Sequence, residues 1–201
     1  MLWPVLLLGG CCHPDTIWCP GERVETRLHW VDDPDLPAEL VLHQVGVRAG
    51  TWLDADRKPW AQMIEAGDLR ALRQGDHRAG DLVLDGCLMV DAYPVLTGDL
   101  PLTAGVVRRV RVVQDLHEQG AEYWVRRPGG VRLIDVPDAD PDHLRDDPDL
   151  CEPTPSDWEP DPEKLRIFSP EQYYALVRDQ LPAEQWQARG FLVDLDVAGP
   201  A

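Results

Sequence analysis

The chain has 201 residues, of which 44% are apolar, a composition that is normal for a globular protein with one sizeable core or two small ones. Its formal net charge of -17 argues against nucleic acids and anionic membranes as partners, because phosphate groups repel an acidic chain. The charge leaves cations, basic proteins and uncharged ligands as partners, and among these we expect a basic protein.

The N-terminal stretch has two interpretations. Residues 2–8 form an apolar run that ends at Gly9-Gly10, which predicts a first β-strand. The same residues resemble a bacterial lipoprotein signal, with Leu8-Gly9-Gly10-Cys11 in the place of the lipobox, although no Lys or Arg precedes the run. The strand interpretation, together with an odd count of five cysteines, predicts a cytoplasmic protein in a reducing compartment. The alternative is a lipid anchor on Cys11 at the cell surface.

Apolar and β-branched runs, separated by connections rich in Pro and Gly, predict many strands. The stretch from Gly80 to Val113 is the expected structural centre, and residues 23–31 alternate between apolar and polar, as a half-buried strand does. Gly46 indicates a bulge or a strand end, and Pro128-Gly129-Gly130 indicates a hairpin turn. The expected strands lie near residues 2–8, 22–31, 40–48, 81–91, 105–113, 122–127, 131–136 and 191–197.

Two segments predict helices that pack on the sheet. Residues 59–73 have an apolar face at helical spacing and are divided at Gly67 into two short helices. Residues 169–189 begin with Ser169-Pro170-Glu171-Gln172, which has the pattern of a capping box with Pro at the first helical position. The apolar face of the first segment consists of Trp60, Met63 and Ile64.

The segment 135–163 differs in composition from the rest of the chain. It holds twelve acidic residues and seven prolines against one arginine. Such a segment cannot bury enough apolar surface to offset the entropy of ordering it, so we expect a surface insert outside the core. Trp158 lies there between two acidic residues, and an exposed aromatic side chain among carboxylates is typical of an interface anchor. The predicted interaction residues are Trp158, Asp157, Glu159, Asp146, Asp147 and Asp149.

Six arginines form the one basic region and lie directly before this acidic segment. A phosphate or nucleic acid ligand is one interpretation. In a chain with a net charge of -17, we favour carboxylates of the same molecule as their partners. The six are Arg108, Arg109, Arg111, Arg126, Arg127 and Arg132.

Two groups of residues have the donor atoms of a metal site. The first offers soft ligands for zinc within nine residues, but it lacks the two spaced pairs of a structural zinc site. The aspartates between 138 and 149 follow the register of a calcium loop, but His143 stands where the sharp turn needs Gly. No cofactor is expected unless zinc binds the first group. That group is Cys11, Cys12, His13 and Cys19.

Three stretches carry a resemblance to a known family: Cys11-Cys12 followed by Pro20-Gly21-Glu22-Arg23-Val24, the run 103–113, and the closing run 190–196. In these pieces the sequence resembles an uncharacterised family of small bacterial β-rich proteins. That family carries no known activity, so the resemblance implies a β-rich fold and no catalytic residues. The acidic segment departs from it.

Together these observations predict one α+β domain over residues 1–134 and 164–201, with 135–163 as an acidic Pro-rich surface insert. We expect a mainly antiparallel, barrel-like sheet with two or three short packing helices. The absence of hydrolase and phosphate-binding motifs favours a non-enzymatic module that binds a basic partner, as an immunity protein or a nucleic-acid mimic does. One alternative is a metal-dependent hydrolase that uses an Asp and His cluster, and a second is a surface lipoprotein.

Overall fold

The computed structural model describes residues 1–8, 18–33, 36–53, 59–75, 78–90, 102–120, 124–136, 169, 172 and 183–197. Within these ranges the chain is nearly all β, so the predicted α+β class is wrong, while the prediction of a β-rich chain is confirmed. No helix in them is long and apolar enough to cross a membrane. The elements are β1 (Leu2–Leu8), β2 (Arg23–Thr26), β3 (Leu28–Val31), the 3-10 helix η2 (Ala38–Leu40), β4 (Leu42–Leu53), β5 (Pro59–Ala66), β6 (Leu69–Gln74), β7 (Gly80–Val90), β8 (Thr103–Gln119), β9 (Trp124–Asp135) and β10 (Glu184–Asp196).

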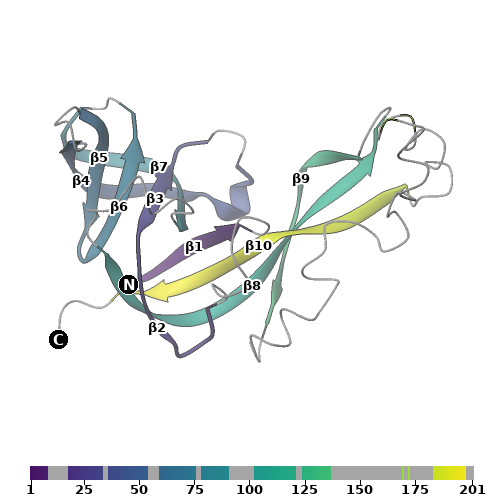
Figure 1. Cartoon of the computed structure of the whole chain (residues 1–201), viewed down its shortest axis with the longest axis horizontal. Helices are drawn as coiled ribbons and strands as arrows, with labels where there is room; N and C mark the ends of the chain where they lie inside the picture. The colour runs from purple at the N-terminus through teal and green to yellow at the C-terminus, as the bar shows by residue number, and fades with distance from the viewer. Residues whose placement is uncertain are drawn as a thin grey trace.

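Five strands, β3 to β7, close into a small barrel (Figure 1). β4, β5 and β6 follow one another as an antiparallel meander. β6 then pairs in parallel with β3, β3 pairs antiparallel with β7, and β7 returns to β4. β4 serves two neighbours, because residues 42–49 pair with β7 and residues 48–53 pair with β5. Closure gives each of these strands two neighbours within the barrel.

A long antiparallel arm extends from the barrel (Figure 1). Its centre is β8, which pairs with β10 on one side and with β2 and then β9 on the other. β1 joins the arm to the barrel, because it lies antiparallel to β10 and parallel to β7. All the strands therefore belong to one continuous sheet.

The main core lies inside the barrel and continues between β1, β8 and β10. Trp3, Trp30 and Leu88 are among its members and are almost completely buried. A second apolar cluster, which includes Leu6 and Cys87, packs on the opposite face of β1. β1 thus buries both of its faces, which explains why residues 2–8 read as a continuous apolar run. The strand predicted there is confirmed.

The helix predicted at residues 59–73 is wrong, because this segment forms the antiparallel hairpin of β5 and β6. Gly67 does not divide two helices. It begins the connecting turn with a φ of 61°, in the position where type II′ turns favour glycine. Gln62, Met63 and Ile64 are consecutive and all buried. A strand buried on both faces shows no alternation, so its apolar pattern cannot be told from that of a helix.

The helix predicted at residues 169–189 is wrong from Glu184 onward, where strand β10 begins. The capping box is present: the Ser169 N–H donates to Gln172 Oε1 at 2.9 Å, and the Gln172 N–H donates to Ser169 Oγ at 3.3 Å. These are the reciprocal bonds of that motif. The residues between Gln172 and Ala183 lie outside the described ranges.

The Pro128-Gly129-Gly130 sequence does not connect two strands, because it lies within β9. Asp115 faces Val131 while His117 faces Arg126, so the extra residues bulge out of β9. Gly129 has a φ of 71°, a conformation that favours glycine. The hairpin prediction is therefore wrong, and the glycines mark a bulge instead.

The acidic insert predicted at 135–163 lies almost entirely outside the described residues. Only its first two residues are described, and Asp135 ends β9. The predicted division of the chain into a domain and an insert therefore stays a prediction.

Candidate functional site

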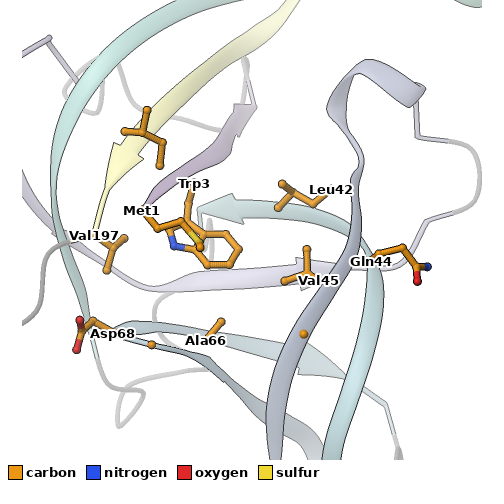
Figure 2. A pocket seen from close by; sticks show the side chains of 11 residues that line it. Met1, Trp3, Leu42, Gln44, Val45, Ala66, Asp68 and Val197 are labelled. Atoms are coloured by element: carbon orange, nitrogen blue, oxygen red, sulfur yellow. The ribbon is translucent and has the colours of Figure 1, made fainter.

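A cavity of about 550 Å³ opens where the ends of β1 and β10 meet the barrel (Figure 2). Binding sites for small ligands typically measure about 300–1,000 Å³. The walls come from the start of β1, the first half of β4, the turn between β5 and β6, and the residue that follows β10. Apolar lining residues are Met1, Trp3, Leu42, Val45, Ala66 and Val197.

The centre of this cavity is apolar and its polar groups lie at the rim. Figure 2 shows the Trp3 indole in the middle, with the side chains of Met1 and Val45 beside it. The polar ends of Gln44 and Asp68 point away from the indole, toward the outside. The cavity therefore suits an apolar group, with polar contacts available only at its entrance.

One wall of the cavity is built on an irregular part of β4. Gln44 has a φ of 54°, and it is the one non-glycine residue of the described ranges with a positive φ. The register of β4 on β7 shifts between Leu42 and Val45, directly before the Gly46 that predicted a bulge. The Gln44 N–H donates to Asp85 Oδ1 at 2.7 Å, and this bond holds the strained residue in place. Such irregularities re-aim side chains, here that of Val45 toward the cavity.

A second hollow of about 490 Å³ adjoins the first on the outside of the barrel. The two share the backbone around Gly46 and Ala66. The second hollow adds the strongly exposed Val83 and the carboxylates of Glu65 and Asp81. The two hollows therefore form one surface, which is apolar along its centre and has carboxylates along its rim.

The charge of the molecule is unevenly distributed between the described strands and the rest of the chain. The described residues hold 15 acidic residues against 13 arginines, a net charge of -2, out of 36 acidic and 19 basic residues in the whole sequence. The remaining -15 belongs to residues outside the described ranges. At the rim, Glu65 pairs with Arg70 at 3.5 Å, Arg48 lies opposite Asp81 in the β4–β7 pairing, and the Met1 ammonium pairs with Asp196. Asp68 therefore supplies the local negative charge.

Most of the site residues predicted from the sequence lie outside the described ranges. This holds for the interaction residues Trp158, Asp157, Glu159, Asp146, Asp147 and Asp149, and for Cys11, Cys12 and His13 of the zinc group. Cys19 is described and half-buried, and its backbone N–H donates to Glu22 Oε2 at 2.9 Å. Among the described residues, no three His, Cys, Asp or Glu side chains lie together as metal ligands would.

The basic region pairs with carboxylates carried by the strands. Arg132 donates to Gln114 at 2.7 Å and stacks on the Trp186 ring. The hydrogen bond from Arg108 holds the pKa of Asp196 below its ordinary value, and the bond from Arg109 does the same for the pKa of Asp135. Contacts with the acidic segment beyond Asp135 and Val136 stay a prediction. The pairs are Arg108–Asp196, Arg109–Asp135, Arg111–Asp194, Arg126–Asp115 and Arg127–Glu184.

Comparisons of the chain with protein-family models, curated proteins and solved structures gave no match. The cavity must therefore be interpreted from its own chemistry. Sequence reasoning missed it, because Trp3, Val45 and Val197 are far apart in the chain and each has the side chain of an ordinary core residue. The only local signals were Gly46, which indicated a bulge or a strand end, and Gly67, which was interpreted as a break between helices and is in fact the turn that shapes one wall.

Proposed function

We propose that this protein is a non-enzymatic binding module whose cavity holds an apolar side chain from a basic segment of a partner protein. The observation that carries this proposal is an apolar cavity of ligand size with carboxylates at its rim. Burial of a large apolar side chain contributes about 1.5–3 kcal/mol. One such anchor at the centre of an interface is a common source of binding energy.

Electrostatics support a basic partner. A net charge of -17 steers positively charged proteins toward the molecule and raises their rate of association. At the cavity, Asp68 is placed to face a Lys or Arg residue next to the anchor. Exposed ion pairs contribute only about 0–1 kcal/mol each. We therefore expect the apolar anchor to set the affinity, and the charges to set the salt dependence and the association rate.

The two alternative functions stay predictions. The hydrolase alternative needs a cluster of Asp and His side chains, for which the sequence assigns no positions. The lipoprotein alternative depends on Cys11, which lies outside the described residues. The cytoplasmic location likewise stays a prediction.

The test compares two Val→Arg variants with a purified partner. Capture from a host lysate at low and high salt identifies the candidate partner, and calorimetry then measures its affinity. Val45→Arg places a guanidinium in the cavity and should abolish binding, because it fills the space and repels a basic segment. Val125→Arg is the matched control, since Val125 is 52% exposed on β9 of the arm.

Circular dichroism establishes that both variants keep the strand content of the unmodified protein. Loss of affinity in Val45→Arg alone supports the cavity as the site. Equal affinity in both variants and in the unmodified protein refutes it.

A further inference from the structure

A polar cluster around Asp115 occupies one face of the arm. In an antiparallel sheet, alternate residues of a strand and their direct partners share a face. Asp115 and His117 therefore lie on the same face as Arg126 and Gln185, which both pair with His117. Arg189 is the extra residue of a bulge in β10, and its Nη1 lies 3.7 Å from Asp115 Oδ2.

Asp115 forms the deep end of this cluster. The residue is 5% exposed, and Arg126 Nε lies 3.5 Å from its Oδ1. Both arginines are thus near enough for ion pairing but too far for good hydrogen bonds. The side chains of Asp115, Arg189 and Arg126 are 8%, 22% and 32% exposed, in that order. The cluster therefore opens gradually from a buried carboxylate toward solvent.

Five buried polar atoms of this face have no hydrogen-bond partner within the described part of the chain. One is Arg111 Nε, whose guanidinium pairs with Asp194 farther along β8. The other four are Asp115 Oδ1, Arg189 Nη1, Gln185 Nε2 and Trp124 Nε1. Trp124 belongs to the same face, because it pairs with Gln119, two residues beyond His117. Folded proteins pair nearly all of their buried polar groups, so a concentration of unpaired atoms at one place points to a ligand.

On the opposite face of the same strands, the buried polar side chain of Gln114 has a hydrogen-bond partner. There Gln114 is buried, and Arg132 Nε donates to its Oε1 at 2.7 Å. The Arg132 guanidinium also stacks on the Trp186 ring, 4.3 Å from its centroid. That polar network is satisfied by its own side chains.

The unpaired atoms define the chemistry of the ligand. Apart from Arg111 Nε, three of them are donors, on Arg189, Gln185 and Trp124, and one is an acceptor, on Asp115. Two guanidinium groups against one carboxylate also leave a net positive charge. Such a site matches a ligand with a carboxylate that accepts from the donors and a hydroxyl that donates to Asp115.

The spacing along the strands indicates the size of the ligand. Asp115 and Gln185 are separated by two residues along the β8–β10 ladder, which is about 7 Å, and Trp124 pairs with Gln119, about 14 Å from Asp115 along β8. The ligand therefore lies between Asp115 and Gln185, and the Trp124 indole stands at the outer end of the face. We propose that this cluster binds a small hydroxylated carboxylate of the size of a sugar acid. The site lies on the arm, and its function is independent of the cavity between β1 and the barrel.

The experiment follows the indole N–H signal of Trp124 by NMR, assigned with Trp124→Phe. Four probes test separately whether binding needs the carboxylate and the hydroxyl: glucuronate, glycolate, acetate and glucose. Glucuronate should move the signal in a saturable way at millimolar concentration, and glycolate should bind more weakly because it is shorter. Acetate lacks the hydroxyl and glucose lacks the carboxylate, so neither should saturate.

Variants then locate the site. Arg189→Gln and Gln185→Leu should each weaken glucuronate binding at least tenfold, whereas Arg132→Gln on the opposite face should leave it unchanged. The proposal is overturned if glucuronate causes no saturable shift, or if acetate causes the same shift. These titrations use the unmodified protein, so they decide the matter even where a variant fails to fold.

Discussion

Gly86 of β7 lies directly against Trp30 of β3. A Cβ at position 86 would sit 2.6 Å from the Val31 carbonyl oxygen and would also overlap the Trp30 indole. The indole N–H of Trp30 donates to Asp32 Oδ1 at 2.8 Å, and Arg73 of β6 donates to the other oxygen of Asp32. Backbone packing and side-chain bonds thus fix β3 between its two neighbours, where the barrel closes.

Gly86→Ala is therefore expected to destabilise the protein. Forcing a methyl group into this contact should lower the free energy of unfolding by about 1–3 kcal/mol. Gly50→Ala in β4 is the matched control, because a Cβ there meets nothing within 4 Å, and its effect should stay within about 0.5 kcal/mol. Urea unfolding of both variants measures the difference. Equal free energies of unfolding for the two variants would show that β3 and β7 can move apart at this contact without loss of stability.

Substitutions at Gln44 should reveal the strain in the wall of the cavity. Gln44→Val places a β-branched side chain at a φ of 54° and is expected to lower the free energy of unfolding by about 1–2 kcal/mol. Gln44→Gly removes the steric strain, which offsets the greater flexibility of the unfolded glycine, so its effect should stay within about 0.5 kcal/mol. Thermal unfolding compares the two. A Val variant as stable as the Gly variant would show that the bulge relaxes.

The positions of most strands could be predicted because half-buried strands alternate. Val24 and Leu28 are buried while Glu25 is exposed, as the pattern at 23–31 indicates. The same pattern does not show which strands pair with one another. β2 pairs with β8 whereas β3 pairs with β6 and β7, although the two strands are almost continuous in sequence. Such long-range pairing depends on register in three dimensions, which no local pattern records.

The candidate sites were harder to predict than the strands. The strand expected at 105–113 continues in fact to Gln119, because the polar residues after Val113 find partners in the fold. Asp115 meets Arg126 from β9 and Arg189 from β10, and only the fold brings these three residues together. From the sequence alone, Asp115 has the appearance of a polar residue at the end of a strand.

The Arg108–Asp196 pair should make stability depend on pH. Hydrogen bonding to Arg108 lowers the pKa of Asp196 below its ordinary value of 3.8. Because the folded pKa is depressed, the pair stabilises the fold at higher pH, and this contribution is lost as pH falls below 3.8 through the lowered pKa. Arg108→Gln should therefore be less stable than the unmodified protein at neutral pH and equal to it in strong acid. Chemical unfolding across pH at low salt checks this, and a constant difference at every pH would contradict it.

The Cys87 thiol should be unreactive while the protein is folded. Burial raises the pKa of Cys87 from 9.0 to about 11, although the Arg189 guanidinium partly opposes the shift. The raised pKa stabilises the fold below pH 9, and this contribution is lost as pH rises toward about 11. The thiolate is the nucleophile, so a variant with Cys87 as its only cysteine should react slowly with an aromatic disulfide at about pH 8. Unfolding in urea should make the reaction fast, and rapid labelling of the folded protein would show that Cys87 is exposed.

Deletion of residues 138–161, bridged by a short Gly/Ser linker, should leave the sheet intact. β9 and β10 each pair with β8 and not with one another in the described part of the chain, so the sheet does not depend on this segment for its strand order. The deletion removes ten acidic residues and one arginine, which brings the net charge from -17 to -8. We expect the melting temperature to move by only a few degrees, and loss of folding would show that the segment is structural.

The same deletion distinguishes the two surfaces that a basic partner could use. If the cavity at Trp3 and Val45 holds the anchor, the shortened protein should bind more slowly and with less dependence on salt, because long-range attraction is reduced. Its dissociation rate should stay close to that of the unmodified protein, since the apolar contacts are kept. Surface plasmon resonance at several salt concentrations separates the two rates. Complete loss of binding by a folded deletion variant would instead place the interaction surface on the acidic segment around Trp158.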